Sequence, residues 1–154
     1  MIAVGNEILA VNDHEFLVIE RDGRAGMNAT FKKIFKIDIA DATTPATDIR
    51  GIPELLTTGT PAGVTPVTKS LFIDLLLSDF GLAGASFPEK IEGLAFGPNL
   101  QDGRILLFVT NDNDFMPGQP NRFWAFAIDQ SDLPNFAPQQ IGLFKKCFDD
   151  VVDR

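Results

Sequence analysis

Residues 90–126 constrain the fold of this chain more than any other part of its sequence. Three short apolar runs in this segment are separated by turn residues and by an acidic loop; the runs are residues 91–96, 105–109 and 122–126. Apolar runs bounded by Gly, Pro, Asn and Asp are typical of strands joined by hairpins. The segment therefore predicts an antiparallel meander of three strands.

Polar side chains gather at one end of this predicted meander. Glu92 stands at the start of the first strand, and Asp112, Asn113 and Asp114 follow the second. The start of one antiparallel strand lies beside the end of the next. The sequence therefore predicts an edge that concentrates carboxylates and amides.

The N-terminal half contains four further candidate strands, at residues 6–11, 16–20, 31–39 and 69–74. Parts of it repeat the later segment: residues 7–11 match 92–96, residues 17–22 match 108–113, and residues 35–38 match 126–129. Repeated four-stranded antiparallel units are typical of β-propellers. We therefore predict an all-β fold of antiparallel four-stranded meanders, amounting to about two blades of a β-propeller.

Two short helices are expected beside these strands. Residues 75–82 predict a short helix that ends at Gly81. Ile141, Phe144, Phe148 and Val151 recur at helical spacing and predict a C-terminal amphipathic helix, which we expect to pack on its own domain. The predicted organisation is a partial propeller domain over residues 1–132 and a helical tail over residues 133–154.

The composition narrows the classes of partner. The net charge of −8 argues against a nucleic-acid or anionic membrane surface, so we expect neither partner. No apolar run is long enough to cross a bilayer, and residues 1–7 lack the pattern of a signal peptide. The single Cys147 cannot form an internal disulfide, so it does not indicate a compartment.

Two groups of residues are candidate ligands for Ca²⁺ or another divalent cation. Asp112 and Asn113 offer the oxygen atoms that hard cations prefer, and Glu20 and Asp22 occupy the matching place in the first repeat. Each group has a structural alternative. Asp112 and Asn113 could bind the amides of their own turn, and Glu20 and Asp22 could belong to a salt-bridged loop.

Glu92 and Arg21 are the candidate catalytic residues. Glu92 precedes a glycine that allows close approach, and the first strand of a propeller blade lines the channel, so Glu92 could face a metal or substrate. The guanidinium of Arg21 could bind a phosphate. The alternatives are a carboxylate that caps backbone amides and an arginine in a salt bridge. A serine mechanism is disfavoured, because His14 is the only histidine and no Gly-x-Ser-x-Gly segment occurs.

Residues 91–98, 101–107, 110–115 and 122–126 together resemble the phytase-like family, which is also named for the esterase-like activity of phytase. Residues 13–22 and 69–74 are similar to the preceding blade of that family. The resemblance implies a β-propeller, hydrolysis of phosphate or carboxylic esters, and a divalent metal. Members of the family are longer, so the resemblance implies that the chain is the C-terminal part of a longer protein, a truncated gene product, or a unit that assembles with copies of itself.

Two functions follow as hypotheses. The first is metal-assisted hydrolysis of a phosphorylated small molecule, with the cation held by some of the acidic residues and Arg21 steadying the phosphate. The second is a non-catalytic propeller fragment that acts as a binding or assembly module. Open sheet edges favour association, so a homo-oligomer that closes them is also expected.

Overall fold

The computed structural model describes residues 4–42 and 64–139, which form two antiparallel sheets. Sheet A pairs its strands in sequence order: β1 (Val4–Ala10), β2 (Glu15–Arg21), β3 (Lys32–Asp38) and β4 (Thr68–Asp74). Sheet B does the same: β5 (Lys90–Phe96), β6 (Ile105–Asp112) and β7 (Phe123–Ile128). The prediction of an all-β, antiparallel fold is confirmed. Sheet B differs from the expected four-stranded unit, because it has three strands in the described part of the chain.

The expected helix at residues 75–82 is a single 3-10 turn, η3 (Ser78–Phe80). Gly81 ends this turn with φ 62°, a left-handed conformation that glycine adopts without strain. A second such turn, η1 (Gly26–Asn28), lies between β2 and β3. The predicted C-terminal helix falls outside the described residues. None of the helical turns within residues 4–42 and 64–139 is long and apolar enough to cross a membrane.

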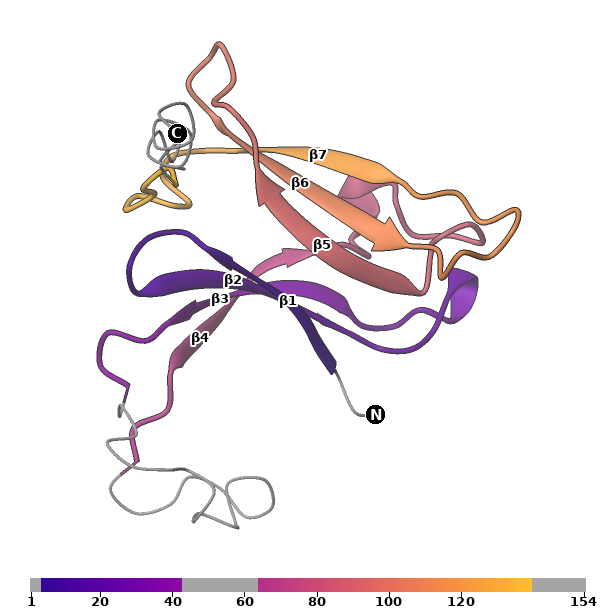
Figure 1. Ribbon diagram of the computed structural model, residues 1–154, viewed down its shortest axis with the longest axis horizontal. Helices are drawn as coiled ribbons and strands as arrows, with labels where there is room; N and C mark the ends of the chain where they lie inside the picture. Colours follow the sequence, from indigo (N-terminus) through magenta and orange to yellow (C-terminus); the bar gives the residue numbers. More distant parts are fainter. Residues whose placement is uncertain (1–3, 43–63, 140–154) are drawn as a thin grey trace, which may run out of the picture.

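The two sheets pack face to face, and β5 contacts both β1 and β2 (Figure 1). One apolar core fills the space between them. Its members are the inward side chains of both sheets together with nearby loop residues: Leu17, Ile19, Ile34, Ile73 and Leu75 from or beside sheet A, Ile91, Ile105, Leu107, Val109 and Ile128 from sheet B, and Val11, Phe87 and Leu133 from loops. Because strand side chains alternate between faces, the core uses every second residue of β2 and β6.

The opposite face of each sheet is also rich in apolar side chains. We call the residues that face away from sheet B the outer face of sheet A: Ile8, Phe16, Val18, Phe35, Ile37 and Leu71. The outer face of sheet B is the matching set that faces away from sheet A: Ala95, Leu106, Phe108, Phe123, Ala125 and Ala127. Because both faces are apolar, strands such as β2 and β6 consist of nearly continuous apolar residues.

Both sheets begin with a bulged strand. The pairing register shifts between Gly5 and Glu7 in β1, and between Ile91 and Gly93 in β5. The extra residue of the second bulge is Glu92, and its counterpart in the first is residue 6. The sequence repeat aligns Glu7 with Glu92, and this alignment is wrong by one position. The bulges determine how the strands pair, whereas shared residue types in two segments do not.

The register also shows that the sheets pack through opposite faces. Leu17 and Ile19 in β2 are buried against sheet B. Their counterparts by register in β6 are Phe108 and Thr110, which lie on the face that turns away from sheet A.

Candidate functional site

Charged side chains collect between the sheets, at the end where β2 finishes and β5 begins. These side chains come from both sheets and the loops beside them. We call them the inter-sheet charge cluster: Arg21, Asp22, Lys32, Glu89 and Glu92. They stand at the polar edge that the sequence predicts. Carboxylates and cations placed together in this way could bind a ligand or join the two sheets, and the contacts distinguish these roles.

Lys32 is the most deeply buried member of the cluster, with an exposed side-chain fraction of 0%. Its Nζ lies 3.1 Å from Oδ1 of Asp22 and donates to the carbonyl oxygen of Asp22 at 2.8 Å. It also donates to the carbonyl oxygen of Glu89, in the segment that enters β5. A buried ammonium group needs such partners, and here one of them belongs to the other sheet.

Asp22 closes the loop between β2 and β3. Its Oδ2 accepts hydrogen bonds from the amide and hydroxyl of Thr30, both at 2.9 Å, and from the amide of Phe31 at 3.0 Å. Its Oδ1 accepts from the amide of Arg24 at 3.3 Å and contacts Lys32. Protein donors thus surround both oxygens of this carboxylate.

These contacts control the protonation of the buried pair. Burial on its own would raise the pKa of Asp22, but the Thr30 and Lys32 donors outweigh burial and lower this pKa from 3.8 to about 2. Burial lowers the pKa of Lys32, and the Asp22 carboxylate opposes that change. Asp22 is consequently ionised at neutral pH, as an ion pair with Lys32 requires.

Arg21 extends from sheet A to the first strand of sheet B. Its Nη2 forms an ion pair with Oε1 of Glu92, and its Nη1 lies 4.0 Å from Oε1 of Glu89. Nη1 also donates to the carbonyl oxygen of Asp22 at 3.3 Å. The buried Nε has no hydrogen-bond partner among the residues that the structure describes. The structure thus brings the two predicted catalytic residues together, but as partners of each other.

Glu20 lies apart from this cluster, although it precedes Arg21 in the chain. Side chains alternate along a strand, so Glu20 stands on the outer face of sheet A, where it forms an ion pair with Lys69. Glu20 and Asp22, which the sequence offers as a pair of metal ligands, therefore belong to different contacts.

Asp112 and Asn113 bind the backbone of their own loop. Oδ1 of Asp112 accepts a hydrogen bond from the amide of Asp114 at 2.9 Å. The Asn113 side chain accepts from the amide of Phe115 at 3.1 Å and donates to the carbonyl of Gln119 at 2.7 Å. These contacts stabilise a tight loop in which Asp114 and Phe115 have φ of 51° and 57°.

The four predicted metal ligands do not converge in this arrangement. Glu20 pairs with Lys69, Asp22 is enclosed by donors, and Asp112 and Asn113 hold a loop. Within residues 4–42 and 64–139, no three Asp, Glu, His or Cys side chains are grouped so that they could hold a metal ion. The residues as placed do not fit a single cation, and a role for Ca²⁺ stays a prediction.

His14 forms a separate contact at the far end of sheet A. Its Nδ1 lies 2.9 Å from Oδ1 of Asp38, and this hydrogen bond raises the pKa of the imidazole above 6.5. Asp38 also accepts from the amide of Ala40 at 2.9 Å. A carboxylate that orients an imidazole is part of many acid–base sites. Here the pair joins the turn after β1 to the end of β3.

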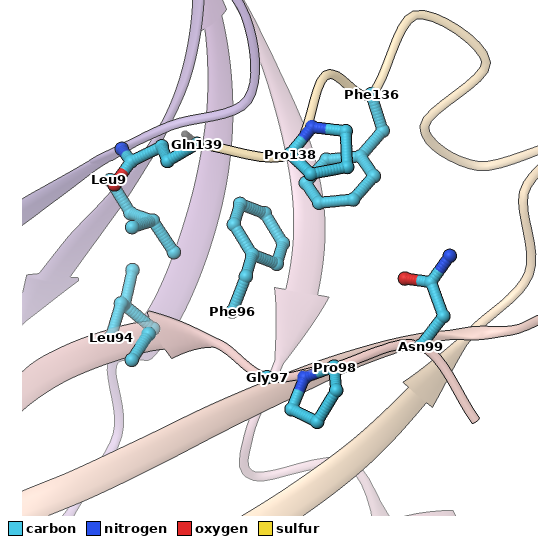
Figure 2. Close-up of a pocket in the computed structure, with 10 residues that line it drawn as sticks. Leu9, Leu94, Phe96, Gly97, Pro98, Asn99, Phe136, Pro138 and Gln139 are labelled. Carbon is cyan, nitrogen blue, oxygen red and sulfur yellow. The ribbon is translucent and has the colours of Figure 1, made fainter. Parts of the chain in front are cut away.

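An apolar pocket of about 600 Å³ lies at the end of the sheets opposite the inter-sheet charge cluster. Leu9 from β1 and Leu94 and Phe96 from β5 face it, and Phe136 and Pro138 lie across from them (Figure 2). The rings of Phe96 and Phe136 are 4.6 Å apart. None of the described residues that line it has a titratable side chain, so these residues supply no general acid or base.

The sequence does not single out Lys32 or Glu89, although both belong to the cluster. In the expected strand at residues 31–39, Phe31, Lys33 and Phe35 alternate on one face, and Lys32 lies on the other. The available signal was Ile34, which breaks that alternation and shares the buried face with Lys32. Glu89 takes part largely through its backbone carbonyl, which no residue pattern reveals.

Comparison with known proteins gives one match. The model of a family described as "Phytase-like: Esterase-like activity of phytase" matches residues 4–115, which is more than half of the chain and includes both sheets up to the end of β6. Neither the curated proteins nor the solved structures contain a match. The matched range includes every member of the inter-sheet charge cluster.

Proposed function

Because this chain belongs to the phytase-like family, we propose that it is a non-catalytic building unit of a propeller-type domain, which acts in binding or assembly. One observation carries this proposal: the charged residues that could perform chemistry already bind protein groups. Lys32 and Arg21 extend from sheet A to Glu89 and Glu92 at the entry to sheet B. The cluster therefore serves to fix one sheet on the other.

The energetics of burial favour this role. A buried lysine or arginine that loses its partner is costly, so such groups are kept where the fold supplies carboxylates and carbonyls for them. The contacts of Lys32 include two carbonyl oxygens, one on each side of the sheet interface. A catalytic lysine or arginine would instead direct donors towards a space that substrate can enter.

The test is a hydrolysis assay on the folded chain, with a phosphate monoester and a carboxylic ester as substrates and with Ca²⁺ present or chelated. We expect no turnover above that of Glu92→Gln. Turnover that requires Ca²⁺ and disappears in Glu92→Gln, while the variant keeps its circular dichroism spectrum, would overturn the proposal. Lys33→Gln, which changes a lysine outside the cluster, is the matched control.

Metal-assisted hydrolysis of a phosphorylated small molecule is the second candidate. The family description, which names an esterase-like activity, and the partial exposure of Glu89 and Glu92 at 48% and 29% favour it. A specific cation site in the folded protein would raise the melting temperature by linkage. A rise with Ca²⁺ over Mg²⁺ at constant ionic strength would favour this candidate, and equal melting temperatures would count against it.

A further inference from the structure

The two outer faces point to an interaction that residues 4–42 and 64–139 do not make with one another. An antiparallel sheet with one face in water usually alternates apolar and polar residues along each strand. β2 and β6 instead carry apolar side chains on both faces. On the outer face of sheet A, Ile8, Val18, Phe35 and Leu71 pair across the four strands in one continuous row. Both ends of this row are open, since Ile8 is 57% exposed and Leu71 is 53% exposed.

The outer faces of the two sheets differ in shape. Large side chains stand on every strand of sheet A. On sheet B, Leu106 and Phe108 lean over Gly97 of the β5 side, where an added Cβ would lie 2.8 Å and 2.9 Å from them. The β7 side of that face carries the small, exposed Ala125 and Ala127 beside them, and the large Phe123, which is 73% exposed, stands at one end of the strand. A face of large side chains and a face with a shallow strip of small ones can pack closely.

Charge also permits burial of the outer face of sheet A. Its two lysines each have a carboxylate partner within the sheet: Lys69 pairs with Glu20, and Nζ of Lys33 lies 3.2 Å from Oδ2 of Asp74. Covering the face would therefore leave neither lysine without an opposite charge. The ammonium of Lys69 also stands 4.1 Å from the centre of the Phe35 ring, which places its aliphatic stem on the apolar row.

We propose that the outer face of sheet A binds the outer face of sheet B in a second copy of this chain. The proposed contact joins one face of sheet A to one face of sheet B. The inward faces of the same two sheets already pack on each other within one chain. A contact between unlike faces is heterologous, so copies join head to tail and close into a ring when the rotation allows. This inference rests on the proposed assembly role and names its partner.

The test uses one substitution on each face, at exposed residues that the isolated fold does not need. Ile8→Glu places a charge on the outer face of sheet A, and Ala125→Glu places one on the outer face of sheet B. We expect light scattering after size exclusion to show a discrete oligomer for the native chain and a monomer for each variant. Phe115→Glu, at a loop residue that is 98% exposed and outside both faces, should remain oligomeric.

A mixture of the two variants gives the sharper result. Each variant keeps the face that the other has lost, so one heterologous contact can still form. We expect an equimolar mixture of Ile8→Glu and Ala125→Glu to give a dimer and nothing larger. A native chain that stays monomeric, a mixture that stays monomeric, or a Phe115→Glu variant that dissociates would each overturn the inference. Hydrolytic turnover by the oligomer would overturn the proposed function and leave this interface intact.

Discussion

The guanidinium of Arg21 at the end of β2 forms an ion pair with the carboxylate of Glu92 in the bulge of β5, and so connects the two sheets. Arg21 is almost completely buried, whereas Glu92 retains some contact with solvent. An extra residue in a bulge re-aims its side chain, and this is how a residue of the first strand of sheet B comes to meet sheet A. The pair is therefore a consequence of the bulge as well as of the charges.

A double-mutant cycle should detect this coupling. We expect Arg21→Gln and Glu92→Gln to be non-additive, with a coupling free energy of unfolding of about 0.5–3 kcal/mol. Denaturant titration of the four proteins measures it. Glu89→Gln is the matched control, because Glu89 lies 4.0 Å from Arg21 and is more exposed, so its coupling should be smaller. Equal coupling for both glutamates would contradict a specific role for the Glu92 pair.

Removal of the buried ammonium should cost more than removal of any surface charge. Lys32→Met keeps the aliphatic volume but removes the ammonium that pairs with the Asp22 carboxylate and donates to two backbone carbonyls. We expect the free energy of unfolding to fall by ~3–5 kcal/mol. Lys33→Met, at the next position on the opposite face, should change it by about 0–1 kcal/mol. Denaturant midpoints that rank the two variants in the reverse order would show that Lys32 is not a structural anchor.

The strands could be predicted from the sequence because turn residues and apolar runs are local signals. Every expected strand forms, and the ends shift by a few residues. The ion pairs of the cluster are harder to predict from the sequence, because they depend on which face of each strand is buried. Phe31 and Phe35 alternate on one face of β3, whereas the structure buries Lys32 and Ile34 on the other face. The bulge that places Glu92 is likewise a property of two paired strands.

The loop residues illustrate a different limit. Asp112 and Asn113 carry the same side-chain oxygens whether they bind a cation or a backbone amide. Sequence spacing cannot separate these roles, because both use short Asx-rich segments with tight backbone turns. The placement of the Asp114 and Phe115 amides within hydrogen-bond distance favours the structural alternative for this loop. Glu20 shows the same ambiguity, which the alternation of β2 resolves by directing it to Lys69.

Acid should weaken the fold through Asp22. The pKa of this group is about 2 in the folded protein and 3.8 as its ordinary value. Its contribution to stability is therefore complete above the ordinary pKa and is lost as the pH falls towards 2, because the unfolded chain takes up the proton first. We expect the stability of Asp22→Asn to vary less with pH across that interval. Denaturant titrations at several acidic pH values would show parallel curves for both proteins if Asp22 had no such role.

The His14–Asp38 contact should act at higher pH and with the opposite sign. Asp38 raises the pKa of His14 above 6.5, so the folded state holds the proton more tightly than the unfolded state. The stabilisation is complete below the ordinary pKa and is lost as the pH rises through the raised one. His14→Gln should lose this pH dependence near neutrality. Two-dimensional NMR titration of the single histidine checks the direction, and a pKa at or below 6.5 would refute it.

The last prediction concerns the close approach of β5 and β6. A Cβ added at Gly93 would lie 2.3 Å from Cγ2 of Thr110, so Gly93→Ala should lower the free energy of unfolding by ~1–3 kcal/mol. Thr110→Ser removes that methyl group and keeps the hydroxyl that donates to the carbonyl of Arg122 at 2.8 Å. The double variant should therefore recover much of the loss. Gly5→Ala, beside the equivalent bulge of β1, is the control, because a Cβ there would meet nothing within 4 Å. A Gly93→Ala protein as stable as Gly5→Ala would mean that the strands separate without cost, and that the bulge does not hold Glu92 in a fixed position against Arg21.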